Sequence, residues 1–309
     1  MWFIYALVST ISWGAADLFY KKGADAEDKY SHLKTSAIVG IVMGAHAIFT
    51  MFANNIDYDP INLLIYLPVS LCYILSMTIG YLGLRYLMLS ISSPIQNSSG
   101  AIVTILCLIF LDQMLDLPSA AGVILICGGI FVLGILEKKK METEIREEDR
   151  KYQVGFKAFF LPIAYCIIDA LGTFFDAYYL DDYRTTPLRG VTERTFEDVA
   201  NISYELTFLL AAIFIFIYIK IIKKQRFGFI EHKNRMVAAL FETGGQAAYV
   251  YAMSGTGVVA APMIASYSIV SLILSRIFLK EKLTGQQYAA VAVVMTGIFL
   301  LGLAEALAE

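Results

Sequence analysis

Five carboxylic acids lie inside long apolar runs of the sequence, where an ionised side chain is costly. They are Asp17, Asp169, Asp176, Glu205 and Glu242. A charge at the centre of a lipid bilayer costs from about 2.5 kcal/mol upward, so each of these acids needs a partner or a water-filled space to stabilise it. Acids in such positions can bind a cation or carry a proton. We therefore treat them as candidate functional residues.

Asp169 is the centre of a polar face on one predicted helix. Tyr165 precedes it by four residues, and Thr173 and Asp176 follow it by four and seven, so the four side chains share one side of the helix. This face predicts contact with a water-filled cavity. The open alternative is an acid that stays neutral or bonds to a neighbouring helix. Asp176, like Glu205, lies near a helix end, where solvation at the membrane surface is a further interpretation.

Glu242 is the acid of a second polar face, because Gln246 and Tyr249 follow it by four and seven residues. Tyr81 lies 168 residues before Tyr249, at the offset of a sequence repeat described below. Aromatic rings beside an acid favour an organic cation through cation–π attraction of about 0.5–2 kcal/mol. Tyrosines that only pack between helices are the open alternative. The predicted substrate-binding residues are Asp169, Glu242, Gln246, Tyr249, Tyr81, Tyr165, Thr173 and Asp176.

The remaining polar residues suggest no catalysis. Asp17 precedes Lys21 by one helical turn, and we expect a local ion pair between them. We expect His46 to bond to another helix, with a proton relay as the alternative. The sequence has no HExxH, no GxSxG and no CxxC, and its three histidines and four cysteines are scattered. We therefore predict neither an enzyme nor a cofactor or metal site.

Composition indicates what kind of fold must position these acids. Hydrophobic residues make up 58% of the chain and charged residues 17%, against about 45–50% and 25% in soluble domains. A run of about 20 apolar residues crosses a bilayer, and only a helix can do so without leaving backbone groups unbonded. We therefore predict an all-α polytopic membrane protein. Its ten helices are expected near residues 2–20, 33–53, 61–84, 93–112, 119–136, 157–179, 200–222, 236–254, 259–279 and 285–304.

The stretch 94–134 is repeated at 262–302, without a gap, at an offset of 168 residues. Ile-Phe-Leu occurs at 109–111 and again at 277–279, and Gly-Ile-Phe at 129–131 and again at 297–299. The repeat predicts two five-helix halves, 1–137 and 155–309, joined by a charged cytoplasmic linker at 138–154. Because five is odd, the second half enters the membrane in the opposite sense. Inverted repeats of this kind are common among secondary transporters.

The distribution of basic residues supports the inversion. Lysine and arginine concentrate in the loops 21–34, 137–151, 220–235 and 280–282, whereas the loops after the second, fourth and eighth predicted helices hold none. By the positive-inside rule the basic loops are cytoplasmic, so both termini are expected on the outer side.

Several short motifs resemble the EamA-type, ten-helix members of the drug/metabolite transporter superfamily. The closing helices carry Pro262, then Ser-Tyr-Ser at 266–268, Leu-Lys-Glu-Lys-Leu at 279–283 and Gly-Ile at 297–298, and the first helix carries Trp-Gly at 13–14. The first half departs from the family pattern, with Asp-Gln at 112–113 in place of a Gly-Glu-type end. The resemblance implies a transporter of a small solute. These motifs are structural and do not specify which one.

We therefore expect a secondary transporter that works by alternating access in the cytoplasmic membrane of a prokaryote. Buried acids outnumber buried bases, which favours an amine-type organic cation or a zwitterion, with proton coupling as one option. Export or facilitated movement of amino-acid-like or neutral metabolites is the alternative, and a membrane-embedded enzyme or sensor comes third. The expected partners are the small-molecule substrate and the lipid bilayer, with a monomer or homodimer and no nucleic acid.

Overall fold

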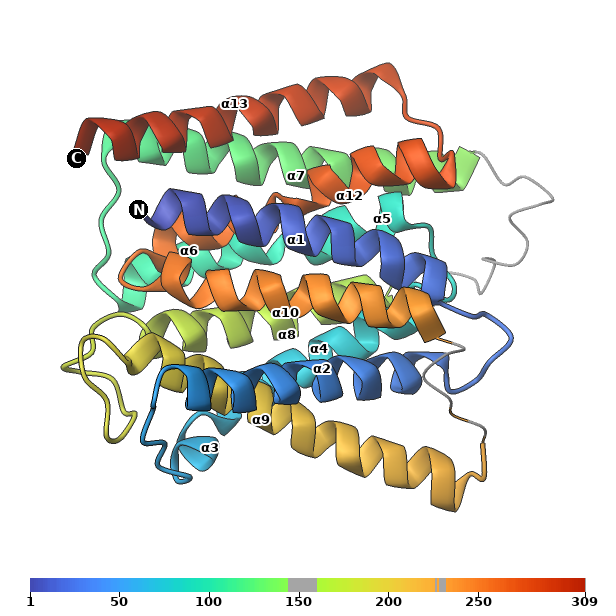
Figure 1. Cartoon of the computed structure of the whole chain (residues 1–309). Helices are drawn as coiled ribbons and strands as arrows, with labels where there is room; N and C mark the ends of the chain where they lie inside the picture. Colours follow the sequence, from blue (N-terminus) through green and yellow to red (C-terminus); the bar gives the residue numbers. More distant parts are fainter. Residues whose placement is uncertain (144–159, 226, 228–231, 309) are drawn as a thin grey trace.

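The computed structural model describes residues 1–143, 160–225, 227 and 232–308, and the regular structure in these ranges is helical (Figure 1). The elements are α1 (Trp2–Gly23), α2 (Ser31–Ala53), α3 (Asn62–Ile65), α4 (Leu67–Gly83), α5 (Leu89–Gln96), α6 (Ser99–Phe110), α7 (Leu117–Thr143), α8 (Phe160–Tyr179), α9 (Phe196–Ile217) with the π-helix η3 (Tyr218–Ile222), α10 (Lys233–Met253), α11 (Gly257–Ala265), α12 (Tyr267–Leu274) with the π-helix η5 (Ser275–Leu279), and α13 (Gly285–Ala308).

The surface of the bundle is that of a membrane protein. Within the described residues, eight helical segments are long and apolar enough to cross a bilayer, and α4 is a shorter apolar helix. Large apolar side chains point outward, including Phe52 at 78% exposure, Phe214 at 71% and Phe299 at 68%. Water disfavours such a surface, whereas lipid chains accept it. The predicted all-α polytopic membrane protein is confirmed.

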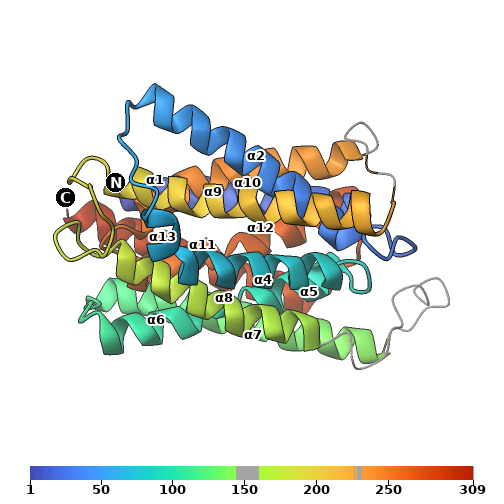
Figure 2. The same cartoon turned by 90° about the horizontal axis from the view of Figure 1, so that it is seen from below.

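The two halves of the chain pack as related units. Helix α1 packs against α10, and its counterpart in the second half, α8, packs against α4, the counterpart of α10. Helices α2 and α9 pack against each other, as do α7 and α13 (Figures 1 and 2). The paired helices run in opposite directions: Asn54, after the end of α2, bonds Asp198 near the start of α9 at 3.0 Å. Two halves of opposite orientation would produce this pattern of neighbours, and the division into repeats at 1–137 and 155–309 stays a prediction.

Glycines between α7 and α13 reproduce the repeat residue by residue. A Cβ on Gly297 would lie 2.7 Å from the carbonyl oxygen of Gly122, and a Cβ on Gly129 would lie 3.3 Å from that of Ala290. Adding 168 to Gly122 and subtracting 168 from Gly297 turns the first pair into the second. The two close approaches are therefore images of each other, with the roles of the helices exchanged. Small residues of this kind allow membrane helices to approach closely.

The helices predicted at 93–112 and 259–279 are each broken in two, which is a correction to the sequence prediction. The breaks lie at Ser98, between α5 and α6, and at Ser266, between α11 and α12, again 168 residues apart. Ser98 donates its hydroxyl proton to the carbonyl of Pro94 at 3.1 Å, and Ser266 donates to that of Met263 at 2.5 Å. Serine hydroxyls that bond the preceding turn compete with the backbone ladder and bend helices. The helix predicted at 61–84 is likewise divided, at Tyr66 between α3 and α4.

The boundary between the predicted halves falls partly outside the described residues. Helix α7 continues to Thr143, past the predicted end of the first half at residue 137. Residues 138–143 of the predicted linker are therefore helical, and residues 144–154 lie outside the described part of the chain.

Candidate functional site

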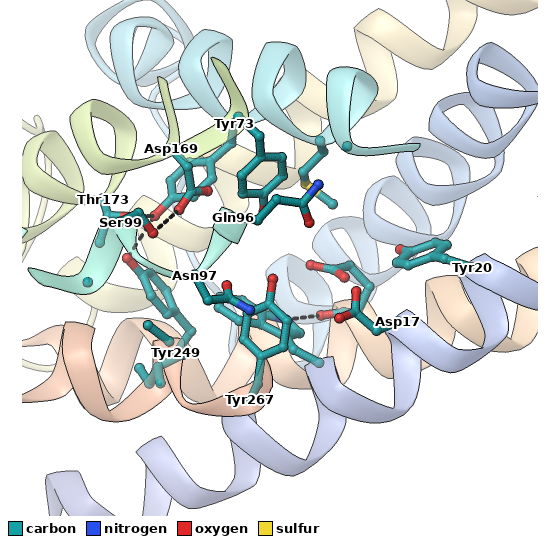
Figure 3. A pocket seen from close by; sticks show the side chains of 18 of the residues that line it. Asp17, Tyr20, Tyr73, Gln96, Asn97, Ser99, Asp169, Thr173, Tyr249 and Tyr267 are labelled. Atoms are coloured by element: carbon teal, nitrogen blue, oxygen red, sulfur yellow. Dashed lines mark hydrogen bonds between the residues drawn. The ribbon is translucent and has the colours of Figure 1, made fainter. Parts of the chain in front are cut away.

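A cavity lies between the two halves, where both broken helices meet the first helices of each half (Figure 3). The space inside it that the centre of a water molecule can occupy is about 70 Å³. Three carboxylic acids line it, Asp17, Asp169 and Glu242, and the described lining contains no lysine, arginine or histidine. Eight aromatic side chains complete much of the wall: Trp13, Tyr20, Tyr73, Tyr81, Tyr165, Tyr204, Tyr249 and Tyr267. The site is therefore both acidic and aromatic.

Serine hydroxyls hold two of the acids in place. Asp169 is 9% exposed and accepts a hydrogen bond from Ser99, at the start of α6, at 2.8 Å. Asp17 accepts hydrogen bonds from Ser93 on α5 at 2.7 Å and from Ser271 on α12 at 2.6 Å. The halves of the broken helices thus supply the donors that position both carboxylates. Hydroxyl donors orient a carboxylate without neutralising it, so its charge remains available to a ligand.

The predicted ion pair between Asp17 and Lys21 is wrong. The ammonium of Lys21 instead donates to the backbone carbonyls of Leu84 and Leu87, at 2.9 and 2.7 Å. These carbonyls lie beyond the end of α4, where helical partners run out, so a cation is well placed there. Asp17 is consequently released to face the cavity.

The aromatic wall is assembled by contacts between helices. The ring of Trp13 lies 5.2 Å from that of Tyr249 and meets Tyr267 edge-on at 5.9 Å. Trp13 can approach α10 closely because Gly245 has no side chain; a Cβ there would lie 2.4 Å from the indole ring. The rings of Tyr20 and Tyr81 lie 4.6 Å apart.

Tyrosine hydrogen bonds connect the helices beside the cavity. The hydroxyl of Tyr73 lies 2.8 Å from Thr173 Oγ1 and 2.8 Å from the hydroxyl of Tyr249. Asp176, one turn beyond Thr173, is fully buried and accepts a hydrogen bond from the hydroxyl of Tyr66. The interpretation of Asp176 as a solvated residue at the membrane surface is therefore wrong.

The structure brings six of the eight predicted binding residues to the cavity and places two elsewhere. Those that line it are Asp169, Glu242, Tyr249, Tyr81, Tyr165 and Thr173. Asp176 and Gln246 are buried outside the lining, with Gln246 only 2% exposed. Glu205 is also fully buried, and its carboxylate lies 2.9 Å from Nδ1 of His46, so the helix-to-helix bond expected of His46 is present. That the six residues bind a substrate stays a prediction.

The sequence reasoning missed several lining residues, including Trp13, Gln96, Asn97 and Ser99. One feature of the sequence could have indicated that Trp13 and Asp17 line the cavity. Trp13 precedes Asp17 by four residues, as Tyr165 precedes Asp169, and each pair lies on the first helix of its half. Gln96 and Asn97 lie at the break after α5, which the apolar pattern of that segment does not reveal. In the part of the chain that the structure describes, no three His, Cys, Asp or Glu side chains group as a metal site.

Comparison with known proteins identifies the family. No curated protein matches the chain in sequence. A solved structure, described only as "Crystal structure of protein", superposes with a TM-score of 0.65 at 13% identity, covering 99% of this chain and 98% of that one, and so supports the fold. The model of the EamA-like transporter family matches residues 1–135 and 200–303. This chain therefore belongs to the EamA-like transporter family of multi-pass membrane proteins.

Proposed function

We propose that this protein is a secondary transporter that carries a small organic cation, bearing an amine, across the cytoplasmic membrane of a prokaryote. The observation that carries the proposal is the composition of the cavity wall: three carboxylic acids, eight aromatic rings and no basic side chain among the described lining residues. An amine that enters replaces its water shell with carboxylates and ring faces. The three acids would repel an anion.

Alternating access fits the two related halves. The substrate would bind at the breaks of α5/α6 and α11/α12, and the halves would rock around it. By the positive-inside bias, the end of the bundle with Leu84 is cytoplasmic. A proton could then replace the substrate on Asp169 or Glu242 during the return step, which would make the protein an antiporter. A proton and a substrate ammonium would neutralise the same carboxylate, so the two would compete for it.

A zwitterionic or neutral metabolite is the second candidate, and the amide of Gln96 favours it. This side chain lines the cavity at 6% exposure, and its Nε2 has no hydrogen-bond partner in the described part of the chain. A buried unpaired donor is costly. A carbonyl or carboxylate oxygen on a substrate would satisfy it.

Transport currents across solid-supported membranes test the proposal. Purified protein in liposomes is given small amines, amino acids and sugars, with and without a pH gradient. We expect currents for amines that disappear in Asp169→Asn and Glu242→Gln and persist in Glu193→Gln, a matched change of an exposed loop acid. Uptake of a labelled neutral metabolite, without current for any amine, would refute the cation proposal and favour the second candidate.

A further inference from the structure

We propose that the cavity selects a linear dication, a short aliphatic chain with an amino group at each end, over a monoamine of the same length. The inference rests on the proposed function, because it assigns a substrate class to the same cavity.

The first step is the separation of two acids. Asp17 bonds Ser93, and Asp169 bonds Ser99, so the two carboxylates are anchored six residues apart along the fourth membrane crossing. Figure 3 shows Asp169 and Asp17 at opposite sides of the cavity, with Asn97 and Tyr267 between them. The proposal therefore places one ammonium at each acid, since such contacts need about 2.8 Å each.

The second step is the likeness of the two ends. Trp13 and Asp17 lie four residues apart on α1, and Tyr165 and Asp169 lie four residues apart on α8. All four line the cavity. Each half of the chain therefore contributes an aromatic ring and an acid on its first helix. Two similar half-sites match a ligand whose two ends are also alike.

The third step concerns phenolic oxygens beside the acids. The hydroxyls of Tyr20 and Tyr81 are buried, at 4% and 7% residue exposure, and interact with each other and with Glu242. Both residues line the cavity, as does Glu242, which experiences the charges of Asp17 and Asp169. An alkylammonium offers three donors. At the Asp17 end it finds a carboxylate and phenolic oxygens that can receive them.

The fourth step is the balance of charge. When all three acids that line the cavity are ionised, a bound monoamine leaves two of them without a counter-charge. A dication neutralises two of them and leaves one, which a single proton can neutralise. At neutral pH both ends of a diamine are charged, because aliphatic amines titrate near 10.4.

The fifth step is the apolar part of the cavity wall. Met77, Gly100, Ala261, Ile264 and Ala265 line the cavity together with the acids. These apolar surfaces suit the methylene groups of an aliphatic linker, each of which contributes about 0.8 kcal/mol when it leaves water.

The test compares diamines with monoamines on the purified full-length protein. Binding of the four-carbon diamine and of the four-carbon monoamine is measured by calorimetry in detergent, followed by a series of diamines from two to eight carbons. We expect the diamine to bind at least about tenfold more tightly, with an optimum inside the series. In Asp17→Asn the ratio of the two affinities should fall toward one. In Asp116→Asn, an exposed loop acid, it should stay as in the wild type.

Three other outcomes would each overturn the inference, and they differ in what they leave of the proposed function. Equal affinities in the wild type would refute diamine selection and leave a monoamine transporter standing. A tenfold ratio that survives Asp17→Asn would refute the two-ended site. Absence of binding by every amine would overturn both the inference and the proposed function. The affinity ratio depends only on folded protein, so partial misfolding of a variant does not affect it.

Discussion

Tyr73 on α4 and Tyr249 on α10 join the two halves of the chain through hydroxyl oxygens that lie 2.8 Å apart. Both side chains are buried, at 6% and 2% exposure, and both line the cavity. The bond therefore links the equivalent third helices of the halves at the level of the site. A motion that separates the halves there must break it.

Removing either hydroxyl should weaken this link. Tyr249→Phe is expected to lower the free energy of unfolding by about 1 kcal/mol, the usual value of one hydrogen bond. Tyr73→Phe should lower it further, because the Tyr73 hydroxyl also bonds Thr173. Because they share one bond, the double variant should cost less than the sum of the two. Denaturant unfolding in detergent measures this, with the exposed Tyr288→Phe as a control. Strictly additive losses would show that the two hydroxyls act independently.

Gly245 should influence substrate binding through Trp13. Gly245→Ala would place a Cβ 2.4 Å from the indole ring, so Trp13 must shift in the cavity wall. We expect amine affinity to fall by about tenfold. Gly244→Ala is the matched control, because no described atom outside its own helix lies within 4 Å of its Cβ. Calorimetric titration of both variants makes the comparison, and equal affinities would contradict the packing argument.

A second pair of adjacent glycines tests the contact between α7 and α13. A Cβ on Gly129 would lie 2.4 Å from Val294 Cγ2, whereas the described structure leaves open space beside Gly128. Overpacking of this kind costs about 1–3 kcal/mol. We therefore expect Gly129→Ala to lower the unfolding temperature and Gly128→Ala to leave it nearly unchanged. Similar shifts in both variants would indicate that the helices do not approach along this face.

The loop between α1 and α2 should give a pH-dependent contribution to stability. Burial acts to raise the pKa of Asp28, but hydrogen bonds from Lys34 and from the backbone N–H of Tyr30 outweigh it and hold the pKa below 3.8. A lowered folded-state pKa stabilises the fold above the unfolded-state value, and the effect is lost as pH falls through the folded-state pKa.

At pH 7 the free energy of unfolding of the wild type should accordingly exceed that of Asp28→Asn by up to about 1 kcal/mol. The difference is small because the ion pair of Asp28 with Lys34 is partly solvated. The difference should shrink as the pH falls below 3.8 and vanish once the carboxyl is protonated in both states. Unfolding curves at a series of pH values measure it, with Asp57→Asn in another exposed loop as a control. A difference that grows at low pH would contradict the assigned pairing.

The sequence by itself determined the class of the fold and much of the acidic site. Apolar runs of membrane-spanning length leave the helix as the only structure that satisfies the backbone. The 168-residue repeat relates two close helix contacts in the structure, that of Gly297 with Gly122 and that of Gly129 with Ala290. Asp169 and Glu242 could be recognised as candidates because an acid in an apolar helix is costly wherever its neighbours are.

Only the tertiary structure decided which polar groups share one space. Asp17 and Lys21 suit an ion pair by spacing alone, yet serines on two other helices bind the acid and distant carbonyls bind the amine. Asp176 lies on the same face as Asp169, but Tyr66 binds it outside the cavity. Helical periodicity fixes the direction of a side chain and says nothing about what the facing helix presents. Partners far apart in sequence supply the hydrogen bonds and the open volume.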